Sequence, residues 1–170
     1  MSEIVDIASS KRVFASDYVD EGVPFFRGKE ITELSKGKKI NTEIYISENK
    51  YQELKEKAGV PKQGDILITS VGTIGNIYLV KADDKFYFKD GNLTWIRGYK
   101  KGFIPFYLKV WFESKLAKDA IERIKIGTTQ QAITIKALNG IKLLCPNSTI
   151  TQLFEKQTAS IFDKHNANIE

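Results

Sequence analysis

The feature that most constrains the fold of this chain is a change in the spacing of its apolar residues at Pro105. After Pro105 the apolar residues recur at helical spacing, as in Phe106, Tyr107, Val110 and Trp111. Before it they form short, β-branched runs bounded by turn residues, which is typical of strands; these runs are Ile66–Ser70, Ile74–Val80, Phe86–Phe88 and Leu93–Arg97. At 170 residues and 42% hydrophobic content, the chain has material for one sizeable core. The pattern predicts an α+β fold, a single domain with a small antiparallel or mixed sheet and flanking helices.

Capping and turn residues set the expected boundaries of several elements. Ser47 is a candidate N-cap, and Gly59 a stop signal, for a surface helix between them. The Asp90-Gly91 dipeptide predicts a turn that joins the third and fourth strands. The pattern further predicts one helix from Pro105 to about Lys125, a short helical turn after Thr134, a strand over Ile141–Cys145 and a last helix capped by Asn147 or Ser148.

The basic residues are concentrated in one part of the sequence. Residues 1–84 carry 12 Lys or Arg and 14 Asp or Glu, residues 85–142 carry 12 and 4, and residues 143–170 carry 2 and 3. The net charge of +5 therefore consists of −2, +8 and −1 in these three parts. A solvated helix face accounts for some of the excess. An excess of eight is nevertheless more than solubility requires, and it favours a surface that faces a polyanion.

Signatures of catalysis are absent from the sequence. It contains no P-loop, no dinucleotide-binding glycine motif and no nucleophile elbow. The single histidine, His165, lies in the tail, so an acyl-transfer triad has no suitable base. The single cysteine, Cys145, cannot form an internal disulfide and reads as a small hydrophobe within its predicted strand. We therefore expect no catalytic residues and no metal site.

The start of the chain and its hydropathy bear on where the protein acts. No long apolar run is present, and acidic residues stand among the first six, where a signal peptide carries basic charge. We therefore expect a cytoplasmic protein that does not bind a membrane.

Two polar, glycine-flanked loops between apolar runs are the main candidates for a binding surface. They are Ser70–Asn76 and Gly127–Ala132. Their Ser, Thr, Asn and Gln side chains can exchange hydrogen bonds with base edges, and their glycines let the backbone approach a groove closely. Each loop alone is equally compatible with a hairpin turn or a bracing role. Together with the basic segment they favour binding.

These loops, with stretches nearer the start of the chain, resemble a known family. Lys11–Phe14, Gly22–Arg27, Gly64–Asn76 and Gly127–Ile133 are similar, in that order, to the target recognition domain of type I restriction-modification specificity (S) subunits. The resemblance extends from about residue 8 to 157, and residues 150–157 are similar to the start of the family's conserved spacer helix. It implies a target recognition domain over residues 1–146 and the start of a spacer or dimerisation helix over residues 147–170.

Specificity subunits have no catalytic activity of their own. The resemblance implies that this chain reads one half of a bipartite site on double-stranded DNA and docks on methyltransferase (M) and restriction (R) subunits. S-adenosylmethionine, ATP and Mg would belong to those partners, and no cofactor to this chain. A full S subunit carries two recognition domains and two long helical regions, whereas this chain offers one domain and a truncated helix. A second copy of this chain is a further candidate partner, which would form a homodimer through the C-terminal helix.

The candidate DNA contacts combine basic residues with loop residues. Lys and Arg are expected to hold phosphates, and polar loop side chains are candidates for base edges. The candidates are Lys11, Arg12, Arg27, Lys29, Ser70, Thr73, Asn76, Lys89, Asn92, Arg97, Lys125, Thr128, Thr129, Gln130 and Gln131. In an alternative hypothesis the residues typical of the family are the scaffold, and the bases are read by segments around Ser35–Asn41 or Lys81–Asn92.

Two other functions are compatible with the sequence. The chain could be the recognition domain of a fused methyltransferase-specificity enzyme, which an adenine-methyltransferase motif elsewhere in the gene product would reveal. It could also be a protein-interaction module that uses the aromatic helix after Pro105 and the apolar stripe of the last helix. A tail-dependent dimer that is indifferent to DNA would favour the interaction module.

Overall fold

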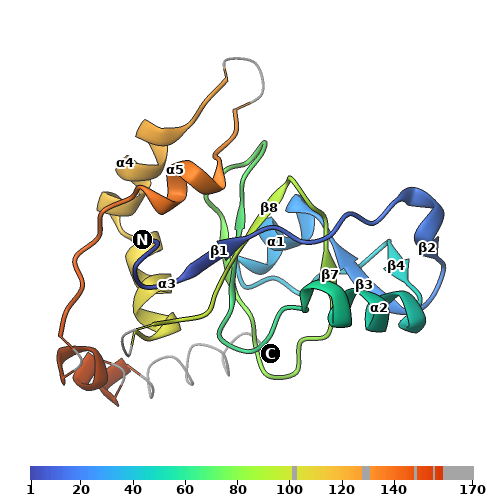
Figure 1. The fold of residues 1–170 in the computed structure, drawn as a ribbon, viewed down its shortest axis with the longest axis horizontal. Helices are drawn as coiled ribbons and strands as arrows, with labels where there is room; N and C mark the ends of the chain where they lie inside the picture. Colours follow the sequence, from blue (N-terminus) through green and yellow to red (C-terminus); the bar gives the residue numbers. More distant parts are fainter. Residues whose placement is uncertain (101–102, 128–130, 148, 155, 159–170) are drawn as a thin grey trace.

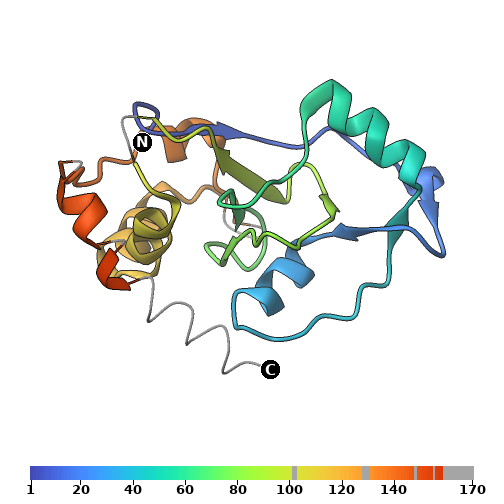
Figure 2. The same ribbon diagram turned by 90° about the horizontal axis from the view of Figure 1, so that it is seen from below.

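A four-stranded antiparallel sheet forms the centre of the computed structural model, which describes residues 1–100, 103–127, 131–147, 149–154 and 156–158. The strand order is β1 (Asp6–Ala8), β8 (Leu93–Arg97), β5 (Ile66–Thr69) and β6 (Ile77–Leu79). Helices cover one side of this sheet, and a second sheet lies on its other side (Figure 1, Figure 2). The predicted α+β class is confirmed, with two small sheets where the sequence suggested one.

The second sheet is mixed and joins distant parts of the chain. Its strand order is β2 (Tyr18–Val19), β4 (Tyr45–Ile46), β3 (Val23–Phe26) and β7 (Tyr87–Phe88). β3 pairs with β4 in antiparallel orientation and with β7 in parallel orientation. Helix α2 (Glu48–Ala58) buries Tyr51 and Leu54 in the core of this sheet.

Strand β5 lies between two cores, which explains its uninterrupted apolar sequence. Ile66 and Ile68 belong to the core shared with α3 (Pro105–Glu113), α4 (Lys115–Ile124) and α5 (Ile135–Asn139). Leu67 belongs to the core shared with β7 and with Ile31 of α1 (Gly28–Leu34). A strand buried on both faces does not alternate between apolar and polar residues.

The predicted signals at Ser47, Gly59 and Asn147 and the short helix predicted after Thr134 are confirmed, and the alternative cap Ser148 lies outside the described residues. The hydroxyls of Ser47 and Thr134 each accept a hydrogen bond from the backbone amide three residues on, at the starts of α2 and α5. Gly59 ends α2 with a φ of 82°. Asn147 Oδ1 accepts from the amide of Ile150 at 2.9 Å, and residues 149–154 and 156–158 are helical.

The predicted turn at Asp90-Gly91 is present, but it connects two layers of the molecule. Gly91 has a φ of 73°, as a tight turn requires. β7 before the turn belongs to the second sheet, and β8 after it belongs to the central sheet. The two strands are therefore consecutive in sequence without pairing with each other.

The single helix predicted from Pro105 to about Lys125 is wrong, because Ser114 divides it into α3 and α4. Ser114 has an extended backbone with a ψ of 157°. Its hydroxyl donates to the carbonyl of Trp111 at 2.6 Å and accepts from the amide of Ala117 at 3.2 Å. One side chain thus ends the first helix and caps the second.

Two strand predictions also need correction. β6 begins at Ile77 instead of Ile74, because the residues before it belong to the turn after β5. Residues 141–145 form no strand, since no described strand pairs with them. Ile141 is buried, whereas Leu144 and Cys145 are exposed, so Cys145 is not a core residue.

The last helix packs on α3 through one aromatic residue. The ring of Phe154 lies 5.9 Å from that of Phe106 and 5.7 Å from that of Tyr107, between centroids. Ile150 and Leu153 of the predicted stripe are exposed; the later part of the stripe and His165 lie outside the described residues. None of the described helices is long and apolar enough to cross a bilayer.

Candidate nucleic-acid interface

The turn between β5 and β6, residues 70–76, is fixed by one buried hydroxyl. Thr69 is 1% exposed, and its Oγ1 donates to the carbonyl of Thr73 at 2.5 Å and accepts from the amide of Asn76 at 3.0 Å. Gly72 and Gly75 have φ values of 77° and 90°, in the left-handed region that favours glycine. The turn therefore has a defined backbone shape, on which the side chain of Thr73 is exposed.

The second polar loop closes on a short antiparallel bridge. Backbone hydrogen bonds of 2.9 Å join Ile126 and Ala132 in both directions. Gly127 has a φ of 88°, and Gln131 is exposed. Three candidates in this loop, Thr128, Thr129 and Gln130, lie outside the described residues.

The two polar loops are hydrogen-bonded to each other. The amide of Gly72 donates to the carbonyl of Gln131 at 3.4 Å, and the amide of Ile133 donates to the carbonyl of Ser70 at 2.9 Å. Val71 also forms an isolated bridge with Ala132. Two segments that the sequence separates widely thus form one edge of the molecule, at the end of the central sheet where β5 ends and β8 begins (Figure 1).

The turn before β8, residues 89–92, joins the same edge. The amide of Ser70 donates to the carbonyl of Asn92 at 2.8 Å. We call residues 70–76, 89–92, 126–127 and 131–133 together the loop edge.

Residues 9–12 run beside this edge and bring basic side chains to it. Ser10 Oγ donates to the carbonyl of Phe88 at 2.8 Å, and Arg12 pairs with Asp90 at 2.9 Å. Lys11 and Lys89 are exposed, and neither forms an ion pair within the described residues. Three predicted phosphate contacts, Lys11, Arg12 and Lys89, therefore lie in one neighbourhood.

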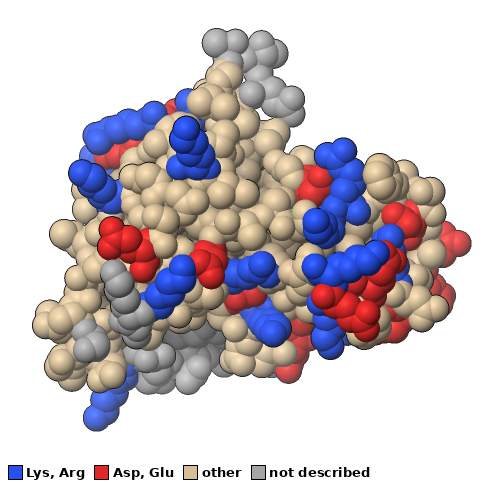
Figure 3. Space-filling view, viewed as in Figure 1, with Lys and Arg blue, Asp and Glu red and all other residues tan. Residues whose placement is uncertain are grey.

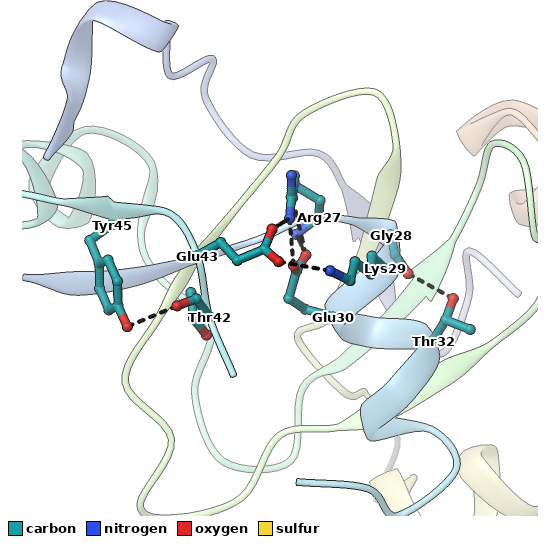
Figure 4. Close-up of polar contacts among 8 residues, drawn as sticks. All are labelled: Arg27, Gly28, Lys29, Glu30, Thr32, Thr42, Glu43 and Tyr45. Carbon is teal, nitrogen blue, oxygen red and sulfur yellow. Dashed lines mark hydrogen bonds and ion pairs between the residues drawn. The ribbon is translucent and has the colours of Figure 1, made fainter. Parts of the chain in front are cut away.

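Arg27 and Lys29 lie at the start of α1 in a network with two glutamates (Figure 4). Arg27 Nη2 lies 2.8 Å from Glu30 Oε1 and 3.2 Å from Glu43 Oε2, and Lys29 Nζ lies 3.1 Å from Glu43 Oε1. Burial by itself raises the pKa of Glu30, but hydrogen bonds from the side chain and amide of Arg27 outweigh it and bring the pKa below its ordinary value. The hydrogen bond from Lys29, and next that from Arg27, lower the pKa of Glu43.

Some predicted base contacts have bracing contacts in the structure. Ser70 is 2% exposed, and its Oγ lies 2.5 Å from Thr94 Oγ1. Asn76 Nδ2 donates to Thr32 Oγ1 at 3.2 Å and to the carbonyl of Thr73 at 3.1 Å, which ties the turn to α1. Asn92 is half-buried and meets the turn through its carbonyl.

Two further predicted phosphate contacts, Arg97 and Lys125, make contacts within the protein. Arg97 is at the opposite end of β8, where its guanidinium lies 4.0 Å from the ring centroid of Trp95 and donates to the carbonyl of Ala58 at 3.1 Å. Lys125 follows α4, is 19% exposed and pairs with Glu122 at 2.5 Å.

The basic segment divides into paired and unpaired cations. Lys85, Lys100, Lys109 and Lys125 form ion pairs. Within the described part of the chain, the segment's exposed cations without an ion pair are Lys89, Lys115, Lys118, Arg123, Lys136 and Lys142. Figure 3 shows Lys and Arg in separate groups over this face, not in one continuous patch. On the face that Figure 3 shows, the basic residues therefore do not outline a DNA footprint.

Sequence reasoning missed three residues that shape this region: Thr69, Glu30 and Glu43. Thr69 is the last residue of an apolar strand, so the sequence pattern gives it no role beyond that strand. Glu30 stands three residues after Arg27, the spacing of a capping box, but an arginine at the N-cap does not match the usual Ser or Thr signature. In the described part of the chain, no three or more His, Cys, Asp or Glu side chains are grouped so as to hold a metal ion.

Comparisons with known sequences agree with the resemblance. The family model described as type I restriction modification DNA specificity domain matches residues 1–170. A protein of Haemophilus influenzae strain Rd, S.HindORF215P, by its name a type I restriction enzyme specificity subunit, is 30% identical over 147 residues. The match covers 86% of this chain and 35% of that protein.

Solved structures with the same fold include two specificity subunits. The S subunit of a type I restriction-modification system from M. genitalium has a TM-score of 0.65 at 18% identity, over 98% of this chain and 38% of its own. The HsdS subunit of Thermoanaerobacter tengcongensis has a TM-score of 0.63 at 19% identity, over 98% of this chain and 37% of its own. The chain thus spans well under half the length of these relatives. With its whole length matched by the family model, it belongs to the family of type I restriction modification DNA specificity domains.

Proposed function

We propose that this chain reads one half of a bipartite site on double-stranded DNA through the loop edge. The observation that carries the proposal is the pairing of the two polar loops, through the bonds from Gly72 to Gln131 and from Ile133 to Ser70. A surface that reads bases needs polar side chains on a backbone of fixed shape. Thr73 and Gln131 are exposed on such a backbone.

In this proposal, different residues contact the bases and the phosphates of the DNA. Thr73 and Gln131 are the described candidates for base edges, with Thr128, Thr129 and Gln130 kept as candidates on sequence grounds. Lys11, Arg12 and Lys89 would hold phosphates beside them. Ser70, Asn76 and Asn92 would keep the edge in shape, because their hydrogen bonds are made inside the protein.

Selection from a random duplex library, with the chain bound to a methyltransferase subunit of its own system, would give the half-site. Gln131→Ala is then expected to relax specificity at one base pair, by about 5- to 100-fold. Lys89→Gln should weaken binding to all DNA sequences alike and reduce the salt dependence of binding by about one phosphate contact. Lys57→Gln on α2, away from the loop edge, is the control. Binding to duplex DNA that is absent or insensitive to salt would overturn the proposal.

We further propose that the chain contributes no catalytic step and docks on methyltransferase and restriction subunits, which would supply S-adenosylmethionine, ATP and Mg chemistry. Methylation of the selected half-site should then require the methyltransferase subunit, with none by the chain alone. Methyl transfer by the purified chain would contradict this proposal.

The last helix is the proposed start of a spacer that mediates assembly. Ile150 and Leu153 are exposed while Phe154 packs inward, so one apolar side of the helix is left uncovered in the described chain. Size-exclusion chromatography of the chain with and without the segment from Ser148 tests whether this helix forms a homodimer. A dimer that persists without the segment would exclude this role.

A further inference from the structure

We propose that Arg27 and Lys29 form a phosphate-binding pair, which Glu43 occupies in the free chain and leaves when a DNA phosphate binds. The inference rests on the proposed function and adds to it a residue that opposes binding. Glu43 lies in the segment between α1 and β4 and reaches back to the first turn of α1 (Figure 4).

The contacts of Glu43 resemble those that a phosphate would make. Its two carboxylate oxygens divide between the two cations, with Oε2 at 3.2 Å from Arg27 Nη2 and Oε1 at 3.1 Å from Lys29 Nζ. Two anionic oxygens on one centre, each facing a different cation, are also what a phosphodiester presents. Arg27 and Lys29 are therefore suited to bind the two anionic oxygens of a phosphodiester.

Arg27 is oriented for this role by a different carboxylate. The side chain of Glu30 is 3% exposed, and it accepts hydrogen bonds from Arg27 Nε at 3.4 Å, Nη2 at 2.8 Å and the backbone amide at 2.7 Å. These bonds fix the plane of the guanidinium. Nη1 has no hydrogen-bond partner among the described residues, so donors remain for an incoming anion.

The two glutamates differ in how easily they can be displaced. Breaking a buried, hydrogen-bonded ion pair is costly, whereas an exposed pair contributes little. Glu43 is 60% exposed and Glu30 is 3% exposed. A phosphate can therefore replace Glu43 while Glu30 continues to hold Arg27.

The pair is connected to the loop edge by short contacts. Thr32 Oγ1 donates to the carbonyl of Gly28 at 2.7 Å, between Arg27 and Lys29, and accepts from Asn76 Nδ2 at 3.2 Å. Asn76 ends the turn after β5. The proposed phosphate pair is therefore connected to Asn76, at the end of the loop edge, across one helical turn of α1.

The test is a comparison of Glu43→Gln with Glu53→Gln, using the full chain bound to a methyltransferase subunit of its own system. Glu53 on α2 also bridges two cations, Lys50 at 3.4 Å and Lys57 at 2.7 Å, so both variants remove the same charge. Binding to a random-sequence duplex and to the selected half-site is measured by fluorescence anisotropy. We expect Glu43→Gln to raise the affinity for both duplexes by about 3- to 10-fold, because phosphate contacts carry no sequence information. Glu53→Gln should change neither affinity by more than about 2-fold.

A second variant separates loss of Glu43 from a general change of charge. Lys29→Gln should weaken binding, and the gain from Glu43→Gln should shrink in the double variant, because the freed cation is missing. Equal gains from Glu43→Gln and Glu53→Gln, or an undiminished gain in the double variant, would overturn the inference while leaving the proposed function intact. Absence of salt-dependent DNA binding by the parent chain would overturn both.

Discussion

The two ends of the central sheet use similar polar residues in opposite ways. At the end away from the loop edge, the indole N–H of Trp95 donates to Asp65 Oδ2 at 2.8 Å, and the amide of Lys62 donates to the same oxygen at 3.0 Å. Arg97 stacks on Trp95 and binds a carbonyl. At the loop edge, buried hydroxyls hold the backbone while Thr73 and Gln131 face solvent. Polar groups that satisfy one another stabilise a fold, and polar groups left facing water are free to bind a partner.

The sharpest difference between the two ends should appear in stability. Asp65→Ala is expected to lower the free energy of unfolding by about 2 to 3 kcal/mol, because the Trp95 indole and the Lys62 amide lose their acceptor. Urea unfolding measures this loss. Asp65→Asn keeps an acceptor oxygen and should lose less. DNA affinity of the folded fraction should be unchanged in both, and a selective loss of affinity would break the distinction between the two ends.

At the loop edge, one hydroxyl should affect stability and binding together. Thr69→Val removes the contacts to the Thr73 carbonyl and the Asn76 amide while keeping the shape of the side chain. We expect a loss of about 1 to 2 kcal/mol and weaker DNA binding, because the turn is no longer held. Thr73→Val, at an exposed hydroxyl, should change stability by less than about 0.5 kcal/mol. A Thr69→Val variant with parental stability would show that the hydroxyl does not hold the turn.

The backbone of the same turn gives a smaller effect. Gly72 has a φ of 77°, and an added Cβ would meet nothing within 4 Å, so Gly72→Ala incurs backbone strain without a clash. The expected cost is about 1 kcal/mol, measured as a lower Tm. Gly28→Ala at the start of α1 is the matched control, since its Cβ would make an ordinary contact at 4.0 Å with Thr69. A greater cost at Gly28 than at Gly72 would contradict this account.

The smallest effects should be in pH dependence, and they should have opposite signs at the two ends. The pKa of Glu30 near the loop edge is lowered, so its contribution to stability is complete above 4.5 and is lost as the pH falls further. Burial raises the pKa of Asp65 from its ordinary value of 3.8, so the stability that comes from protonating Asp65 is complete below 3.8 and is lost as the pH rises; the hydrogen bonds that Asp65 accepts from Trp95 and Lys62 are a separate contribution. Unfolding measured across this range should become less acid-sensitive in Glu30→Gln and more acid-sensitive in Asp65→Asn. A change of acid sensitivity in the same direction in both variants would contradict the opposite pKa shifts of Glu30 and Asp65.

Cap and stop signals were predicted accurately, whereas the break at Ser114 and the pairing between distant strands were not. The caps at Ser47 and Asn147 depend on residues within one helical turn, which a sequence displays directly. Ser114 was missed because its neighbours continue the helical spacing and only its own hydroxyl interrupts the helix. The parallel pairing of β3 with β7 joins strands that are far apart in sequence, and the spacing of apolar residues within each strand does not indicate which distant strand it pairs with.

The candidate site shows the same limit. The order of the two polar loops in the sequence indicated a binding surface and the family, but the bonds that join them form only in the folded chain. Ser70 was a reasonable base-contact candidate by residue type, yet the strand beside it, which supplies Thr94, buries it. Glu43 carried no signal at all, because nothing near it in sequence pairs with it.

The parallel pairing of β3 with β7 has a consequence for how the chain folds. Joining Phe25 to Tyr87 closes a loop of about sixty residues, which costs more entropy than closing the short turn between β5 and β6. Local pairs of this kind form quickly, and non-local parallel pairs form slowly. The central hairpin should therefore appear early, and the second sheet should be completed last. During synthesis, the apolar residues Phe25 and Phe26 of β3 would lack their parallel partner strand until β7 has left the ribosome, although β4 is already available to pair with the start of β3.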